Sequence, residues 1–492
     1  MEKLKLLLVF ALSAVFIYGC DRQVDPFSSE ACLDFLYQYM PVDDEFAYDK
    51  QFWEDNVAKT LEVRDKMGWD VPAREFLHFV LPVRVADEPL DRFRLEYADS
   101  LCEAVKGLSM SDAVLAINTW CYSYINYVSS GTGNYSPLGV MYHKGGQCDA
   151  MAVFSVSALR AAGIPARKVN VLWPNTNLGH SWTEVWVDGK WRFIGSAERH
   201  VGLDMSWFSD RASQSFLTSV EVFGNYDGPE PVISRTDRTT MINTLANYTA
   251  KLRDAEVRVL TPDGKPVQDA NVQFMMYSNG SLATLSDSRT DTDGLACLPG
   301  TGLGSLVVFA FKGDRYGLCV SKNPKTDIVL DGHLPGQVHF KTVELLIPPP
   351  SGVFPQDTLN LFDRLLEENV VIDAVREARV WPNPDSLSYD AVHKASRPHI
   401  PKTKLPSKAG DIDLVIKSPE GRSFGRDFSI LHFGDECLEP LISYKVTPGS
   451  YLLVTGVRPE ENRIELGLDV FTIPDNVRIA NIPVTMRTDF KY

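Results

Sequence analysis

Cysteine is scarce in this sequence, with eight residues in 492, so a small scaffold held together by disulfides is excluded. Basic residues are also in the minority. The net charge is −15, and a chain this acidic is not expected to bind nucleic acid through a basic face. Metal-ligand clusters at credible spacing, phosphate-binding loops, dinucleotide fingerprints and nucleophile-elbow serines are missing, so we expect no metal and no cofactor.

Only the N-terminus contains a long apolar run. Two lysines precede an apolar stretch over residues 6–19, which is too short to cross ~30 Å of hydrocarbon but is typical of a signal peptide. The stretch ends in Tyr-Gly-Cys at Cys20, which resembles the lipobox of bacterial lipoproteins. The resemblance implies lipidation of Cys20 and a membrane-anchored protein of the bacterial cell envelope, on the periplasmic face or the cell surface. An ordinary signal peptide with a chance cysteine is the alternative.

The fold class that the sequence predicts is multidomain α+β. Apolar residues recur at helical spacing before residue 107, whereas short strands separated by Asp-Gly turns follow residue 250. The strand pattern resembles the prealbumin-like or carboxypeptidase-regulatory-like β-sandwiches of exported bacterial enzymes. We predict a signal peptide at 1–20, a helical region at 21–107, an α+β core at 108–235, a β-sandwich at 250–345, a helix and proline-rich connector at 355–410, and a second β-sandwich at 411–492.

Cys148 is the candidate nucleophile. It follows Gly145, Gly146 and Gln147 at the start of a predicted helix whose apolar face runs over residues 151–162. The glycines let another segment come close, and the partial positive charge of the first helical turn favours a thiolate. The backbone N–H of Cys148, with possible help from the Gln147 side chain, is the candidate oxyanion site.

His180 begins the next predicted hairpin. Asp188-Gly189 is a strong signal for a two-residue loop, and the return strand covers residues 190–194. With such a loop, His180 faces Ala197, and Gly195 is its diagonal neighbour on the same face, at ~7 Å. A carboxylate at Gly195 would therefore reach the imidazole.

Three linked motifs resemble the transglutaminase-like superfamily of papain-like cysteine enzymes. They are the Gly-Gln-Cys at 146–148, the Ala-Leu-Arg-Ala-x-Gly-Ile-Pro-Ala-Arg run at 158–167, and the His-x-Trp-x-Glu-Val hairpin at 180–191. The match covers roughly residues 108–210, and the local sequence also resembles the peptide N-glycanase branch. The resemblance implies a papain-like α+β fold, with Cys148 as the nucleophile and His180 as its base.

The family's third catalytic residue is missing here. The family places an aspartate four residues after the tryptophan of the return strand, and counting from Trp191 gives Gly195. Glu198 is the nearest replacement, although a regular strand would turn its side chain to the opposite face. A bulge at Gly195 would re-aim Glu198 toward His180; otherwise water or a backbone carbonyl orients the ring.

Two further features leave alternatives open. Cys102 with Cys121, or Cys297 with Cys319, could pair in an oxidising compartment, and buried thiols are the alternative. Several of the nine tryptophans gather between residues 173 and 207. They would either line a cleft for peptide or sugar, or pack the sheet against helices.

The sequence therefore predicts a cysteine enzyme that acts on amide bonds. Hydrolysis of peptide, cell-wall or glycopeptide amides is favoured over acyl transfer to an amine, and the expected partners are such a substrate and the membrane. The alternative is an inactive surface binding module, because Gly195 occupies the position of the family's acid.

Overall fold

The computed structural model describes residues 25–129, 135–174, 179–199, 202–278, 281–335, 341–346, 348, 379–382, 412–417, 428–441, 445–460 and 463–483. The predicted signal peptide with Cys20 lies outside the described residues. So does the predicted helix and connector at 355–410, except for residues 379–382. Within the described part of the chain, no helix is long and apolar enough to cross a membrane.

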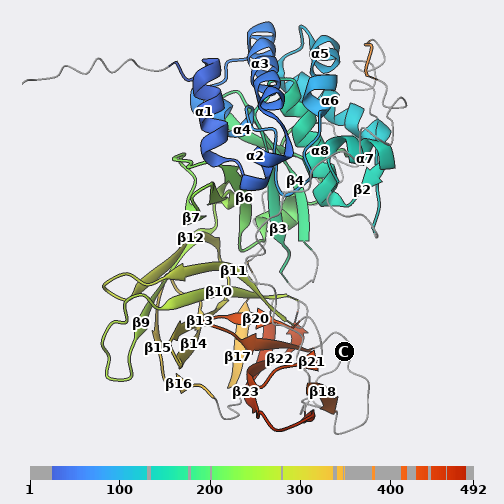
Figure 1. Cartoon of the computed structure of the whole chain (residues 1–492). Coiled ribbons are helices and arrows are strands. Elements are labelled where there is room, and N and C mark those ends of the chain that lie inside the picture. Colours follow the sequence, from blue (N-terminus) through green and yellow to red (C-terminus); the bar gives the residue numbers. More distant parts are fainter. Residues whose placement is uncertain are drawn as a thin grey trace, which may run out of the picture.

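Helices form the first part of the structure, at the top of Figure 1. They are α1 (Ser29–Tyr39), α2 (Val42–Ala47), α3 (Lys50–Met67), α4 (Ala73–Phe79), α5 (Phe93–Val105) and α6 (Met110–Tyr124). The side chains of Ser28 and Asp49 accept backbone N–H groups at the starts of α1 and α3. Gly68 ends α3 in the left-handed conformation, at φ 63°. The predicted helical N-terminal region is confirmed.

A six-stranded antiparallel sheet follows, in the order β5-β4-β3-β6-β8-β7. Its strands are β3 (Ala166–Leu172), β4 (Gly179–Val187), β5 (Lys190–Ile194), β6 (Thr218–Phe223), β7 (Val232–Arg235) and β8 (Thr239–Asn243). Around it lie the short strands β1 (Asn126–Tyr127) and β2 (Gly145–Gly146), α7 (Pro137–His143), α8 (Cys148–Ala161), α9 (Ser209–Ser213) and the 3₁₀ helix η1 (Leu245–Asn247). The sheet thus continues past the boundary predicted at residue 235.

The central helix of this part is α8, which packs against α5, β3 and β4. Its buried side chains share one apolar core with those of α5 and α6. The hairpin β4–β5 turns at Asp188-Gly189, with φ values of 54° and 76°, and pairs Val187 with Lys190. The predicted two-residue loop is therefore confirmed.

The C-terminal half is a stack of four β-sheets, in the lower part of Figure 1. The first two sheets contain β9 (Leu252–Leu260), β10 (Asn271–Ser278), β11 (Ser281–Arg289), β12 (Leu295–Gly302), β13 (Leu306–Lys312), β14 (Arg315–Ser321), β15 (Lys325–Val329) and β16 (Gly332–His333). The other two contain β17 (Lys341–Leu346), β18 (Ile412–Lys417), β19 (Phe428–Phe433), β20 (Leu438–Pro440), β21 (Lys445–Val446), β22 (Gly449–Glu460), β23 (Arg463–Ile473) and β24 (Ile479–Pro483).

The two predicted sandwiches share a core. Along β13, Val307 and Phe309 contact the sheet formed by β17, β23, β22, β19 and β20, whereas Val308 and Ala310 contact the sheet of β12, β9 and β15. The continuous apolar run of this strand is the sequence pattern of a sheet buried on both faces. One predicted boundary is corrected. The sequence prediction placed β17 in the first sandwich, at 250–345, but β17 pairs with β23 of the second, with Lys341 opposite Leu468.

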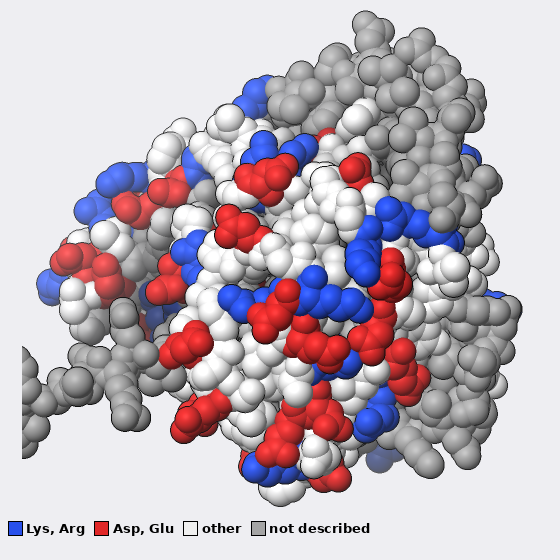
Figure 2. All heavy atoms as spheres, turned by 90° about the horizontal axis from the view of Figure 1, so that it is seen from above, with Lys and Arg blue, Asp and Glu red and all other residues white. Residues whose placement is uncertain are grey.

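Charged side chains on the helical end are intermixed. Figure 2 shows Lys and Arg side chains (blue) beside Asp and Glu side chains (red) on this face. Lys59 bridges Glu62 on its own helix and Asp99 on α5, at 2.7 and 3.0 Å. Exposed pairs of this kind add little stability, because water and salt screen them.

A buried ion pair joins two neighbouring strands of the six-stranded sheet. The Arg167 guanidinium on β3 donates to the Glu184 carboxylate on β4 at 2.7 Å, and both side chains are almost fully buried. Glu184 also accepts from Asn247 and from the Tyr248 hydroxyl, at 2.9 and 2.6 Å. Glu184, which belongs to the His-x-Trp-x-Glu motif, is therefore a structural residue.

We expect Glu184→Ala to lower the free energy of unfolding by about 3–5 kcal/mol, because it leaves the Arg167 charge buried without its main partner. Urea denaturation of the full chain, followed by fluorescence, measures this change. The matched control is Asp327→Ala, which breaks the exposed Arg258–Asp327 pair and should cost at most about 1 kcal/mol. Equal losses for the two variants would contradict the structural role given to Glu184.

Candidate active site

Cys148 is the first residue of α8, directly after the short strand β2. β2 pairs in parallel with β1, and the approach is so close that a Cβ on Gly145 would lie 2.4 Å from the backbone oxygen of Asn126. A Cβ on Gly146 would lie 2.7 Å from the side chain of Ala150. Larger residues would therefore push the start of α8 out of position.

The Cys148 thiol is only partly accessible, and burial raises its pKa. A backbone hydrogen bond from Ser181 and the more distant charge of Lys168 act in the opposite direction, while the Asp149 carboxylate adds to the rise. The direction of this shift is opposite to the one expected for a cysteine at a helix start, because removal from water is the largest contribution and disfavours the thiolate.

His180 lies on β4, one residue before Ser181, and is enclosed by aromatic rings. The ring centroids of Trp207 and Phe208 are 5.0 and 5.1 Å from that of the imidazole. Burial lowers the pKa of His180 to about 4, and no charged group opposes the shift. The imidazole is therefore neutral at pH 7 and able to accept a proton.

The residue after Cys148 links the start of α8 to the strand that carries the candidate base. Asp149 accepts from the Ser181 hydroxyl on β4 at 3.3 Å and from Lys168 on β3 at 2.5 Å. Asp149 thus ties the start of α8 to two strands of the sheet.

One nitrogen of the His180 ring lacks a hydrogen-bond partner among the described residues. This atom, Nε2, is buried. The β4–β5 ladder ends at the pair Thr183–Ile194, so the predicted pairing of His180 with Ala197 does not form. Gly195 follows directly after the last residue of β5.

Glu198 does not bind His180. A turn rather than a bulge redirects the chain here, because Ala197 adopts a positive φ of 50°. The Glu198 carboxylate accepts the indole N–H of Trp207, at 3.1 Å from both oxygens, and burial raises its pKa. The carboxylate therefore acts on His180 only through the ring of Trp207, which packs against the imidazole.

Asn118 on α6 is a residue that sequence reasoning missed. Its side-chain amide accepts the backbone N–H of Ala197 and donates to the backbone oxygen of Glu198, both at 2.8 Å. The side chain is 1% exposed. A polar residue inside an apolar helical face was the available signal, since buried amides of this kind are hydrogen-bonded.

Other predicted site features have definite positions. The Gln147 side chain donates to the backbone oxygen of Ser129 at 3.2 Å. Trp173 and Trp182 are buried, which supports the packing interpretation for them, whereas Trp207 is 51% exposed beside His180. No disulfide joins Cys102 to Cys121 or Cys297 to Cys319 in the described chain.

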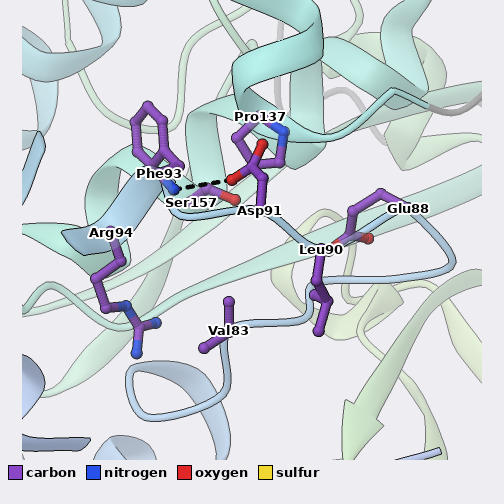
Figure 3. A pocket seen from close by; sticks show the side chains of 8 residues that line it. All are labelled: Val83, Glu88, Leu90, Asp91, Phe93, Arg94, Pro137 and Ser157. Atoms are coloured by element: carbon purple, nitrogen blue, oxygen red, sulfur yellow. Dashed lines mark hydrogen bonds between the residues drawn. The ribbon is translucent and has the colours of Figure 1, made fainter. Parts of the chain in front are cut away.

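A small internal cavity lies apart from these residues, lined by Val83, Glu88, Leu90, Asp91, Phe93, Arg94, Pro137 and Ser157 (Figure 3). Its volume of about 10 Å³ is enough for one water molecule and not for a substrate. Within the described residues, no group of His, Cys, Asp or Glu is arranged to hold a metal ion. Neither Cys148 nor His180 lines this cavity.

A family model of the Transglutaminase-like superfamily matches residues 98–194, which include both Cys148 and His180. These residues form a transglutaminase-like domain. The predicted superfamily is thereby confirmed for this segment, and the match begins in α5, before the predicted start at residue 108. The peptide N-glycanase branch stays a prediction.

Solved structures resemble the chain only distantly. A TGase is 24% identical, with a TM-score of 0.18, over 22% of this chain and 31% of its own. A candidate cysteine protease from Cytophaga hutchinsonii is 15% identical (TM-score 0.18; 42% and 66% covered), and the transglutaminase of red sea bream is 8% identical (TM-score 0.19; 48% and 57% covered). The chain thus spans less than two thirds of each. No curated protein shows a significant match.

The depressed pKa of His180 predicts acid sensitivity. In the unfolded chain a histidine titrates near pH ~6.5, so the unfolded state binds an extra proton between that pH and about 4. Stability should fall by about 3 kcal/mol over this range as the pH drops. His180→Gln should remove that part of the pH dependence, and denaturation of both proteins at pH 7, 6, 5 and 4 measures the difference. Parallel curves would contradict the buried neutral imidazole.

Asn118→Ala should destabilise the protein by about 2–4 kcal/mol, because two buried backbone groups lose their partner. Adding Ala197→Gly should recover part of that loss, since glycine adopts the left-handed conformation without the ~1–2 kcal/mol penalty of alanine. Ser123→Ala is the matched control on α6, because its hydroxyl bonds only within the helix. Thermal unfolding of these three variants and of the unchanged protein tests this, and a double variant no more stable than Asn118→Ala would contradict the role given to Asn118.

Proposed function

We propose that this protein is an exported, lipid-anchored cysteine hydrolase that cleaves amide bonds in peptides, cell-wall peptides or glycopeptides. One observation carries the proposal: Asp149, the residue after Cys148 at the start of α8, accepts from the hydroxyl of Ser181, the residue after His180, at 3.3 Å. Acyl-transfer chemistry requires a nucleophile that an adjacent base activates, and this bond joins the elements that carry the candidate nucleophile and the candidate base. The lipobox-like Cys20 supports export and a membrane anchor.

Catalysis would begin from a neutral pair. As the Cys148 sulfur attacks the amide carbon, its proton passes to His180, and a C–S bond forms. His180 then gives that proton to the leaving nitrogen as the C–N bond breaks, which releases the amine and leaves a thioester. Water, deprotonated by His180, cleaves the thioester and restores the thiol. His180, with a pKa of about 4, remains a functional base down to mildly acidic pH.

Backbone N–H groups at the start of α8 would stabilise the oxyanion. The first turn of a helix has N–H groups without an intrahelical partner, and that of Cys148 is among them. The Gln147 amide donates one hydrogen bond to the backbone oxygen of Ser129. To stabilise the oxyanion, it would have to break this bond or donate its second hydrogen. The main contribution is therefore assigned to the backbone.

An inactive binding module is the second candidate, and a specific observation favours it. Among the described residues, Nε2 of His180 has no hydrogen-bond partner, and a glycine occupies position 195. Loss of a catalytic acid would leave the histidine in this condition. In a serine triad, loss of the acid costs ~10⁴ in rate. The Trp207–Glu198 pair would compensate for this loss only by fixing the imidazole in place.

Acylation by p-nitrophenyl acetate separates the two candidates, because the ester needs an activated thiol but no particular substrate. We expect rapid release of p-nitrophenolate and an acetyl mass increase at Cys148 in samples that are quenched with acid during the reaction. His180→Ala should slow acylation by roughly 10²–10⁴-fold. Cys297 is an internal control: it is exposed, and partial desolvation with the carboxylates of Asp254 and Glu256 raises its pKa to about 11.

Mass spectrometry of tryptic peptides gives both acylation rates in one sample. If Cys148 reacts no faster than Cys297, and His180→Ala changes nothing, the enzyme proposal fails and the binding module replaces it. If the predicted acceleration is found, peptide and glycopeptide amides become the substrates to screen, with Cys148→Ser as the blank.

A further inference from the structure

Four residues from the C-terminal half lie against the helices of the N-terminal half. The segment 379–382 falls between β17 and β18 in the sequence, yet Arg379, Trp381 and Pro382 contact the end of α5 and Trp120 of α6 (Figure 1). The two sides of one of these contacts are 275 residues apart in the chain. A contact this remote has a large loop-closure cost, so it requires specific interactions to persist.

Arg379 binds the end of α5. Its guanidinium donates to the backbone oxygens of Ala104 and Lys106, at 2.7 and 3.0 Å. The last carbonyls of a helix lack intrahelical partners and carry partial negative charge, and α5 has no basic residue of its own in its last turn. Arg379 therefore supplies the missing cation.

Trp381 and Pro382 complete the surroundings of Trp120 on α6. The two indoles stack with centroids 6.4 Å apart and planes inclined by 18°. The Trp120 indole N–H donates to the backbone oxygen of Pro382 at 3.1 Å, and Trp120 is fully buried. Without the segment, this polar group and part of the ring would be left without their partners.

The residue between the two anchors points the other way. Val380 is 90% exposed, whereas Arg379 and Trp381 are both partly buried on the helices. The contact therefore depends on specific side chains, Arg379 and Trp381. If the segment packed only through nonspecific burial of apolar surface, Val380 would be buried as well.

We propose that the surface formed by the end of α5 and by Trp120 of α6 is a docking site for the chain's own Arg-x-Trp-Pro motif at 379–382. Docking closes the core of the transglutaminase-like domain with a segment that the C-terminal half supplies. The same helix α6 carries Asn118, which holds the Ala197–Glu198 turn beside the candidate site. The inference is independent of the chemistry proposed above.

Hydrogen exchange measured by mass spectrometry on the full chain tests this docking. In Trp381→Ala, we expect amides of residues 101–108 and 116–125 to exchange at least about tenfold faster, because local opening becomes easier. Arg379→Ala should accelerate residues 101–108 alone. Val380→Ala, in the same segment but pointing to solvent, is the matched control and should leave all rates unchanged.

Peptides from β13 (Leu306–Lys312) give the internal reference, since that strand is buried in the β-stack. The proposal is overturned if Trp381→Ala and Val380→Ala exchange alike, or if β13 accelerates as much as α6. Should Trp381→Ala give no folded protein, Arg379→Ala decides: unchanged exchange at 101–108 refutes the docking site. Cys148 chemistry is not a readout here, so an inactive Cys148 would leave this result intact.

Discussion

Arg167 and Glu184 lie on adjacent strands with almost no exposure, and a charged pair at such depth is tolerated only with further hydrogen bonds around it. Those bonds extend in two directions. Glu230 after β6 accepts from Arg167 at 2.6 Å, and Asn247 and Tyr248, at the end of η1, donate to Glu184. Because the chain passes from η1 to β9 within a few residues, the hydrogen bonds around this ion pair link the six-stranded sheet to the start of the C-terminal β-sheets.

Burial also decides the electrostatics of the candidate site. At a helix start, an exposed cysteine would gain acidity from the nearby N–H groups. Cys148 and His180 are instead partly enclosed, and loss of water penalises the charged form of each, which raises one pKa and lowers the other. Burial therefore favours the neutral form of both groups. Asp149 fixes the start of α8 against Ser181, and the ring of Trp207 packs against the imidazole.

The C-terminal β-sheets show why sequence patterns of single strands do not predict how the sheets stack. Alternation and turn signals indicated short strands after residue 250, since both are properties of short segments. Whether a face is covered by its own sandwich or by the next one depends on residues hundreds of positions away. β13 is apolar on both faces for this reason, and β17 joins the second sandwich because its partner strand β23 lies there.

The sequence by itself determined the helix that carries Cys148, the His180 hairpin with its two-residue turn, and the superfamily of residues 98–194. Each depends on neighbours close in the chain, where spacing and turn chemistry are sufficient. Tertiary structure alone decided that the ladder stops at Ile194, that Ala197 turns Glu198 onto Trp207, and that Asn118 and the Arg379 segment bind where they do. These outcomes pair buried polar groups that are far apart in the sequence, and only the folded chain brings such partners together.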